Sequence, residues 1–317
     1  DLHEMDNLDN FHDNIISTQI LGKIDKKNKW DLNTQEERIF IDKLLKYTIP
    51  LGLCEGVNIY RGITTGCNEA FIINGEQRAR LIKEDPNCEN IIKPIIRGRD
   101  IKRYDIHFSD MWIIFISWHF PLQENVITEK LFGKAENALQ SRYPSIYKHL
   151  KNYEIELRNR NEAEVGVRYE WYALQRCAAT YQDAFEKEKI VWGLTSDKWA
   201  FAHDDKGMYL PSNGYILVSE IIPIKFLLGL MNSSIMKRWF AIRGIMTVGG
   251  AYTLKAGTIN KMPIRIPNSY EKFVDIVDVI IQKVNSLEND SDKYSNEKIL
   301  ELEDQLDIEF EKLYSLS

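Results

Sequence analysis

The sequence predicts an α+β fold, in which a mixed, mostly antiparallel β-sheet body carries flanking helices and is followed by a C-terminal helical hairpin. Short β-like runs lie between residues 57 and 218, and turn sequences rich in glycine, proline and aspartate separate several of them. Stretches before, within and after this region show apolar residues at helical spacing. Two acidic amphipathic stretches close the chain. Together these patterns indicate sheets covered by helices.

The first predicted element is a helix of about three turns. Thr34 and Glu37 have the spacing of a capping box, which satisfies backbone donors at a helix start. Apolar residues then recur at helical period, at Ile39, Phe40, Leu44 and Leu45. We expect residues 1–49 to be a helical lead-in from an upstream domain.

Three β-like runs follow, at residues 57–60, 70–74 and 111–118. The third is almost wholly apolar, which predicts a strand in the centre of a sheet. A helix is then expected from Pro144, because proline favours the first helical position. Its apolar stripe is Ile146, Tyr147, Leu150, Tyr153 and Leu157.

Further β-like runs lie at residues 189–192, 198–203 and 215–218. The sequences between them, residues 204–207 and 211–214, are typical of hairpins or turns. Pro223 then opens a predicted helix with the buried stripe Phe226, Leu227, Leu230, Met231, Ile235 and Trp239, ending near Arg243 with Gly244 as its C-cap.

Residues 268–317 are predicted to form an acidic helical hairpin. One apolar stripe runs from Phe273 to Leu287 and a second from Ile299 to Leu313, and the polar stretch 288–292 lies between them. The region between the two helical ends, residues 50–267, is the predicted main domain.

The cysteine content and spacing favour a protein whose cysteines are reduced. The four cysteines form no CxxC pair, and the sequence has neither a signal peptide nor an apolar stretch near 18 residues. We therefore expect a soluble, cytoplasmic protein without a membrane partner. Since the chain begins at Asp1, we also expect it to be part of a longer protein.

The net charge of −6 is unevenly distributed. Residues 61–265 carry a net charge of +6, whereas residues 1–60 and 266–317 carry −4 and −8. A mildly basic middle permits nucleic-acid binding without establishing it, since strong nucleic-acid domains are more basic.

The sequence shows no recognised catalytic motif. No proline follows an asparagine or another proline, so the Asn-Pro-Pro-Tyr motif of DNA amino-methyltransferases is missing. Phosphate-binding glycine motifs and paired histidine ligands are missing too. Asp204 and Lys206 have the closest spacing to a metal-dependent nuclease, but a solvated hairpin turn is the favoured interpretation. We therefore assign this chain no catalytic residue, cofactor or metal.

Two segments suggest polyanion binding. In the first, Arg61 precedes a glycine- and threonine-rich turn, where Gly62 and Gly66 are expected at positive φ; the candidate contacts are Arg61, Thr64, Thr65 and Asn68. The alternative is an ordinary strand-turn-strand corner.

The second segment runs from Lys93 to Tyr104. It offers Arg97, Arg99, Lys102, Arg103 and Tyr104 to phosphates or a guanine edge. Its alternative is a solvated loop with internal Arg-Asp pairing.

Two further segments mix cations with aromatic residues. One supplies the candidates Arg168, Tyr169 and Arg176, while Trp171 and Tyr172 beside them are equally suited to a core. The other, after Gly249 and Gly250, supplies Tyr252, Thr253 and Lys255. A plain loop is the alternative there.

The four segments, taken in their order along the chain, resemble the TaqI-like specificity domain. This domain is the target-recognition region of type IIG restriction-modification enzymes and related adenine methyltransferases. The similar pieces are residues 62–71, 96–104, 185–192 and 230–233, then Leu254 through the Met262-Pro263-Ile264 segment, and the closing residues 306–316. The resemblance spans about residues 50–267.

The resemblance implies a non-catalytic module that binds double-stranded DNA. A separate upstream methyltransferase domain would flip and methylate an adenine with S-adenosylmethionine. The whole protein would then be an adenine-specific DNA methyltransferase, with or without type II restriction endonuclease activity and its Mg²⁺. The alternative hypothesis is a protein-interaction module that docks onto a catalytic subunit through its acidic C-terminal helices. The bases recognised do not follow from the resemblance.

Overall fold

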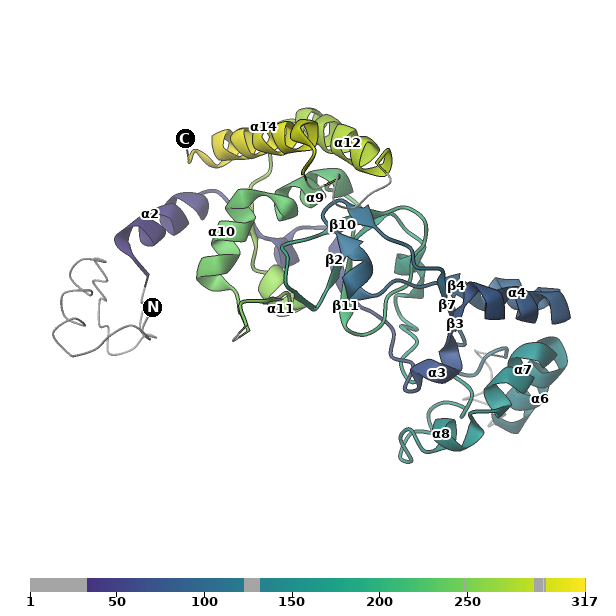
Figure 1. Cartoon of the computed structure of the whole chain (residues 1–317). Coiled ribbons are helices and arrows are strands. Elements are labelled where there is room, and N and C mark those ends of the chain that lie inside the picture. The colour runs from purple at the N-terminus through teal and green to yellow at the C-terminus, as the bar shows by residue number, and fades with distance from the viewer. Residues whose placement is uncertain (1–32, 123–131, 248, 288–292, 294, 317) are drawn as a thin grey trace, which may run out of the picture.

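The structure is a computed structural model that describes residues 33–122, 132–247, 249–287, 293 and 295–316. Its fold is α+β, as predicted, and it is elongated, with helices at both ends and antiparallel sheets between them (Figure 1). The helices are α2 (Gln35–Leu44), α3 (Asn68–Phe71), α4 (Gly75–Glu84), α6 (Phe132–Arg142), α7 (Pro144–Lys151), α8 (Glu154–Arg158), α9 (Ile224–Asn232), α10 (Ser234–Arg243), α11 (Ala256–Ile259), α12 (Glu271–Asn285) and α14 (Glu297–Tyr314). Short 3-10 turns include η1 (Leu51–Leu53), η2 (Pro86–Ile91), η3 (Gly98–Asp100) and η5 (Gln182–Phe185).

The largest sheet has the antiparallel order β10-β8-β11-β2. Its strands are β2 (Val57–Arg61), β8 (Lys189–Gly193), β10 (Ala202–Asp204) and β11 (Gly214–Ser219). The sheet separates two hydrophobic cores, because side chains alternate between its faces. Ile190 and Trp192 of β8 enter the first core, whereas Val191 between them enters the second.

The first core joins the sheet to the helices at both ends of the chain. Side chains of α2, α9, α10, α12 and α14 fill it. In Figure 1, α12 and α14 lie side by side over α9, which confirms the predicted C-terminal helical hairpin. The predicted capping box is also present, since Thr34 Oγ1 accepts from Glu37 N and Glu37 Oε2 accepts from Thr34 N.

The second core belongs to the opposite end of the molecule. A small sheet with the order β3-β7-β4 packs there with α4, α6 and α7. Its strands are β3 (Ile72–Asn74), β4 (Ile92–Pro94) and β7 (Met111–Ile114). The apolar run after Met111 therefore does contain a central strand, although the strand ends at Ile114.

Two-stranded pairings complete the fold. These involve β1 (Ile49–Pro50) with β13 (Pro263–Ile264), β5 (Ile101–Lys102) with β6 (Asp105–Ile106), and β9 (Thr195–Ser196) with β12 (Tyr252–Thr253). Among the described residues, none of the helices combines the length and the hydrophobicity that a membrane span requires.

The structure corrects three local predictions. Of the two predicted alternatives, residues 211–214 do form a turn, in which Gly214 N donates to the Pro211 carbonyl at 2.9 Å. However, β10 and β11 do not form a hairpin, since both pair with β8 from opposite sides. Asp204 is not a solvated turn residue: it is buried in an ion pair with Lys189 (2.5 Å) and caps Lys206 N and Met208 N. The helix predicted from Pro223 is interrupted at Ser233, but its second part, α10, ends at Arg243 with Gly244 as its C-cap, as predicted.

Candidate nucleic-acid interface

Two adjoining hollows lie beside the end of β8. One has a volume of about 930 Å³ and the other about 650 Å³, and both are lined by Gly98, Arg99 and Thr195. We call their combined surface the trough. Its walls come from residues 63–72, 97–103, 194–200 and 211–213, with Lys237 and Tyr252. Three of the four segments singled out in the sequence therefore meet at one surface.

The first segment forms one end of the trough. Gly66 has a φ of +78°, as predicted, but Gly62 is not at positive φ. Gly62 is needed for close approach instead, because a Cβ there would lie 2.1 Å from the Pro211 carbonyl oxygen. Arg61 donates through Nε to the Ser212 carbonyl at 2.6 Å and so holds two walls of the trough together.

A half-buried arginine supports this end through contacts with the backbone. Arg160 donates to the carbonyls of Thr65 (2.6 Å), Trp171 (2.6 Å) and Ala173 (2.7 Å). Burial lowers the pKa of its guanidinium, which stays cationic and finds its hydrogen-bond acceptors in the backbone. Because Thr65 itself is buried and donates to Asn68 Oδ1 (2.7 Å), it holds the turn rather than facing solvent.

The second segment contributes the middle of the trough. Asp100 is buried and accepts from Arg97 N (2.8 Å), Arg97 Nε (3.2 Å) and Ser109 Oγ (3.0 Å). This closes the turn η3 and directs Arg99 into solvent at the junction of the two hollows. Arg99 and Lys102 form no ion pair with the described residues, so their charges are available to a ligand.

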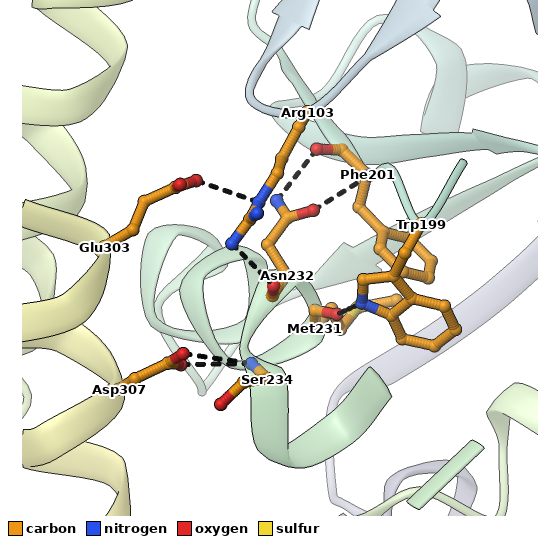
Figure 2. A network of polar contacts seen from close by, with 8 residues as sticks. All are labelled: Arg103, Trp199, Phe201, Met231, Asn232, Ser234, Glu303 and Asp307. Carbon is orange, nitrogen blue, oxygen red and sulfur yellow. Dashed lines mark hydrogen bonds and ion pairs between the residues drawn. The ribbon is translucent and has the colours of Figure 1, made fainter. Parts of the chain in front are cut away.

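The next turn of the same segment is anchored instead. Arg103 lines the trough, but its Nε lies 2.8 Å from Glu303 Oε1 and its Nη2 donates to the Asn232 carbonyl at 3.1 Å (Figure 2). Tyr104 is 3% exposed, and burial raises the pKa of its hydroxyl. Asp105 pairs with Lys293 at 2.6 Å. Two predicted DNA contacts, Arg103 and Tyr104, thus connect the body to the C-terminal helices.

The contacts around Arg103 and Asn232 explain the break between α9 and α10. The Asn232 amide exchanges two hydrogen bonds with the backbone of Phe201, at 3.1 and 2.9 Å, and Trp199 donates to the Met231 carbonyl at 2.7 Å. Asp307 accepts from the backbone N–H of Ser234 at the start of α10 (Figure 2). Side chains from distant segments therefore satisfy both helix ends.

The third segment is largely structural. Tyr169 and Tyr172 are fully buried and Trp171 is 3% exposed, so the aromatic residues fill the second core. Arg168 forms an ion pair with Glu164 (3.0 Å). Arg176 is exposed, and its backbone pairs with Thr64, which places it next to the trough turn.

The fourth segment reaches the trough through β12. Tyr252 lines the smaller hollow and pairs with Ser196, while Thr253 pairs with Thr195. Lys255 is exposed beyond them. The sequence predictions missed the residues on the other side of this pairing, from Thr195 to Lys198, and also Lys237 on α10. The turn composition of Thr195-Ser196-Asp197 was their only local signal.

The trough is cationic on balance. Its lining includes six cationic side chains, Arg97, Arg99, Lys102, Arg103, Lys198 and Lys237, and two acidic ones, Glu69 and Asp197. Asp100 and Glu303, which pair with Arg97 and Arg103, line neither hollow. Neutral polar side chains (Thr64, Asn68, Thr195, Ser196, Ser212 and Asn213) lie among the charges. Such a surface combines cations for phosphates with hydrogen-bonding groups for base edges.

Comparison with known proteins gives several similarities. A type II methyltransferase, M.MjaIV of Methanocaldococcus jannaschii, is 26% identical over 229 residues, which are 71% of this chain and 71% of that protein. The solved structure of the type IIL restriction-modification enzyme MmeI in complex with DNA superimposes with a TM-score of 0.56 at 13% identity, over 82% of this chain and 33% of that one. The type IIG restriction endonuclease BpuSI gives a TM-score of 0.44 at 11% identity, over 89% and 33%.

The chain thus spans about a third of the length of these two solved enzymes. The similarity to MmeI is one of fold. The sequence model of the TaqI-like C-terminal specificity domain matches residues 93–264, more than half of the chain. This chain therefore belongs to the TaqI-like C-terminal specificity domain family.

Proposed function

We propose that this chain is the target-recognition module of a restriction-modification enzyme and that its trough binds double-stranded DNA. The observation that carries the proposal is the trough, where Arg99 and Lys102 present unpaired charges beside neutral hydrogen-bonding side chains. Family membership supports a recognition role, and the fold similarity to MmeI, which was solved with DNA, supports the choice of ligand.

The chemistry belongs to another domain in this proposal. The upstream part of the same polypeptide or complex would methylate adenine with S-adenosylmethionine, and the chain would position it on the duplex. The methyltransferase relative M.MjaIV supports this context. Cleavage, with its Mg²⁺, would belong to a further domain of the same enzyme. We also propose a cytoplasmic location, where the enzyme would meet DNA.

The candidate contacts divide by their surroundings. Arg97, Arg99 and Lys102 are proposed for phosphates, together with Lys237 in the smaller hollow and with Arg176 and Lys255 beyond the hollows. Thr64 and Asn68 are proposed to contact the duplex at the first end of the trough. Thr65, Tyr104 and Tyr169 are excluded from the interface in this conformation because their side chains are buried.

The C-terminal helices give the alternative function less support. Their inner faces are occupied by α9, and Glu303 and Asp307 are engaged by Arg103 and Ser234. These contacts give the acidic helices a bracing role within the chain. Docking onto a catalytic subunit would have to use their outer faces.

Fluorescence anisotropy with a labelled duplex tests the proposal. The chain should bind at low salt with an affinity that falls steeply as salt rises, because phosphate contacts release counterions. The double variant Arg99→Glu/Lys102→Glu should lose binding and keep its unfolding midpoint. Lys83→Glu, in the last turn of α4, is the control for a charge reversal outside the trough and should bind normally. Equal binding by the trough variant and the control would contradict the proposal.

A further inference from the structure

One carboxylate stands out among the cations of the trough. Asp197 is exposed on the smaller hollow, which it shares with Arg99, Lys102 and Lys237. It forms no hydrogen bond or ion pair with any residue that the structure describes. An unpaired acid at this place repels a polyanion, so it lowers the affinity for any duplex unless it makes a favourable contact of its own.

Asp197 is held on a firmly anchored loop. Leu194 donates its N–H to the Asn213 carbonyl and accepts from Leu254 N, both at 2.7 Å. Thr195 and Ser196 then pair with β12. Because these bonds connect the loop to β11 and β12, the position of Asp197 is set by the body of the domain.

The loop does not need Asp197 for its own structure. The bend at this residue is closed by Ser196 Oγ, which accepts from the backbone N–H of Lys198 at 3.3 Å. Aspartate commonly stabilises turns by accepting such bonds, but here the neighbouring serine takes that role. The usual structural reason for an aspartate in a turn is therefore absent.

Among the groups on a base edge, a carboxylate suits amino donors. Cytosine presents its N4 amino group alone, whereas the N6 amino group of adenine lies beside the N7 acceptor, which repels a carboxylate. We infer that Asp197 is a specificity-determining residue that accepts a hydrogen bond from the N4 amino group of a cytosine in the recognised sequence. The inference rests on the proposed function, since it requires a duplex in the trough.

The second acid of the trough provides a matched control. Glu69 lies in the first turn of α3, where a negative charge is favourable, and it accepts from Cys67 Sγ at 3.7 Å. Its presence therefore has a local explanation. Replacing either acid removes one negative charge from the trough, but only Asp197 is assigned to a base.

Selection from a pool of random duplexes tests the inference. The wild-type chain, Asp197→Ala and Glu69→Ala are each used to enrich bound duplexes, which are then sequenced. We expect a wild-type consensus that includes cytosine, a loss of preference at one C·G pair in Asp197→Ala, and an unchanged consensus in Glu69→Ala. At that pair, wild-type discrimination against T·A should be roughly tenfold and should fall to about twofold in Asp197→Ala.

The outcomes separate the inference from the proposed function. Enrichment by the wild type with an identical consensus in Asp197→Ala would overturn the inference alone. A loss of preference spread evenly over all positions in Asp197→Ala would do the same, because it indicates a general change in the trough. Absence of any enriched sequence with the wild type would overturn both. Equal unfolding midpoints of the three proteins show that each is folded.

Discussion

Two consecutive turns between Arg97 and Asp105 have similar compositions and different environments. In the first, Arg97 pairs with Asp100 only three residues away, which closes the turn and leaves Arg99 in the trough. In the second, Arg103 pairs with Glu303, which belongs to a helix at the far end of the sequence. The local pair of Arg97 with Asp100 thus leaves the neighbouring Arg99 exposed to a ligand. The pair of Arg103 with the distant Glu303 instead makes Arg103 part of the framework, the contacts that connect the body to the C-terminal helices.

The largest expected effect concerns the anchored turn. Arg103→Ala leaves the Glu303 carboxylate buried without its cation, and removing one partner of a fully buried pair costs about 3–5 kcal/mol. Since the Arg103 side chain is 32% exposed, solvent screening reduces the expected loss of unfolding free energy to about 2 kcal/mol. Urea denaturation measures this. Arg99→Ala is the control, and a larger loss there than in Arg103→Ala would refute the assignment.

The same variant has a predictable pH dependence. Burial raises the pKa of Glu303, and Arg103 opposes that shift. Without Arg103 the pKa rises further above its unfolded value, so the folded state of the variant gains stability where Glu303 is protonated and loses it as pH increases through that pKa. The deficit of Arg103→Ala relative to wild type should therefore be smaller at pH 5 than at pH 8.

The trough turn should depend on its local acid. Asp100→Asn keeps the size of the side chain but weakens its three bonds to Arg97 and Ser109, and we expect a loss of about 1–2 kcal/mol in unfolding free energy. Duplex affinity should fall as well, because Arg97 and Arg99 lose their positions. Asp205→Asn, an exposed acid outside the trough, is the control. Normal stability in Asp100→Asn would show that the turn does not need its carboxylate.

The sequence identified these turns but not their difference. Local patterns predicted the capping box at Thr34, the central strand after Met111 and the two C-terminal helices, because each depends on neighbours within a few residues. The break at Ser233 was missed. Ser233 caps α10 locally by accepting from Met236 N, but the other contacts at the break come from the distant residues Trp199, Arg103 and Asp307. The trough loop after Leu194 was missed for the same reason: its strand partner is β12, more than fifty residues away.

A smaller effect separates the exposed cations from the anchored one. Arg99→Ala/Lys102→Ala should leave the unfolding midpoint unchanged, lower duplex affinity roughly tenfold and reduce the slope of log affinity against log salt by about 2. Anisotropy titrations at several salt concentrations measure both values. An unchanged slope would mean that these two side chains do not contact phosphates, and the trough would lose its proposed ligand.

The smallest expected effect marks the limit of the interface. Lys255 is exposed beyond β12 but lines neither hollow, so Lys255→Ala should lower duplex affinity about twofold and reduce the salt slope by less than 1. Lys261→Ala, an exposed cation further along the same segment, should have no effect and is the control. An effect of Lys255→Ala as large as that of the Arg99→Ala/Lys102→Ala pair would extend the DNA-binding surface beyond the trough. The DNA-binding surface would then include residues after β12, since the Lys255 ammonium group would also contact a phosphate.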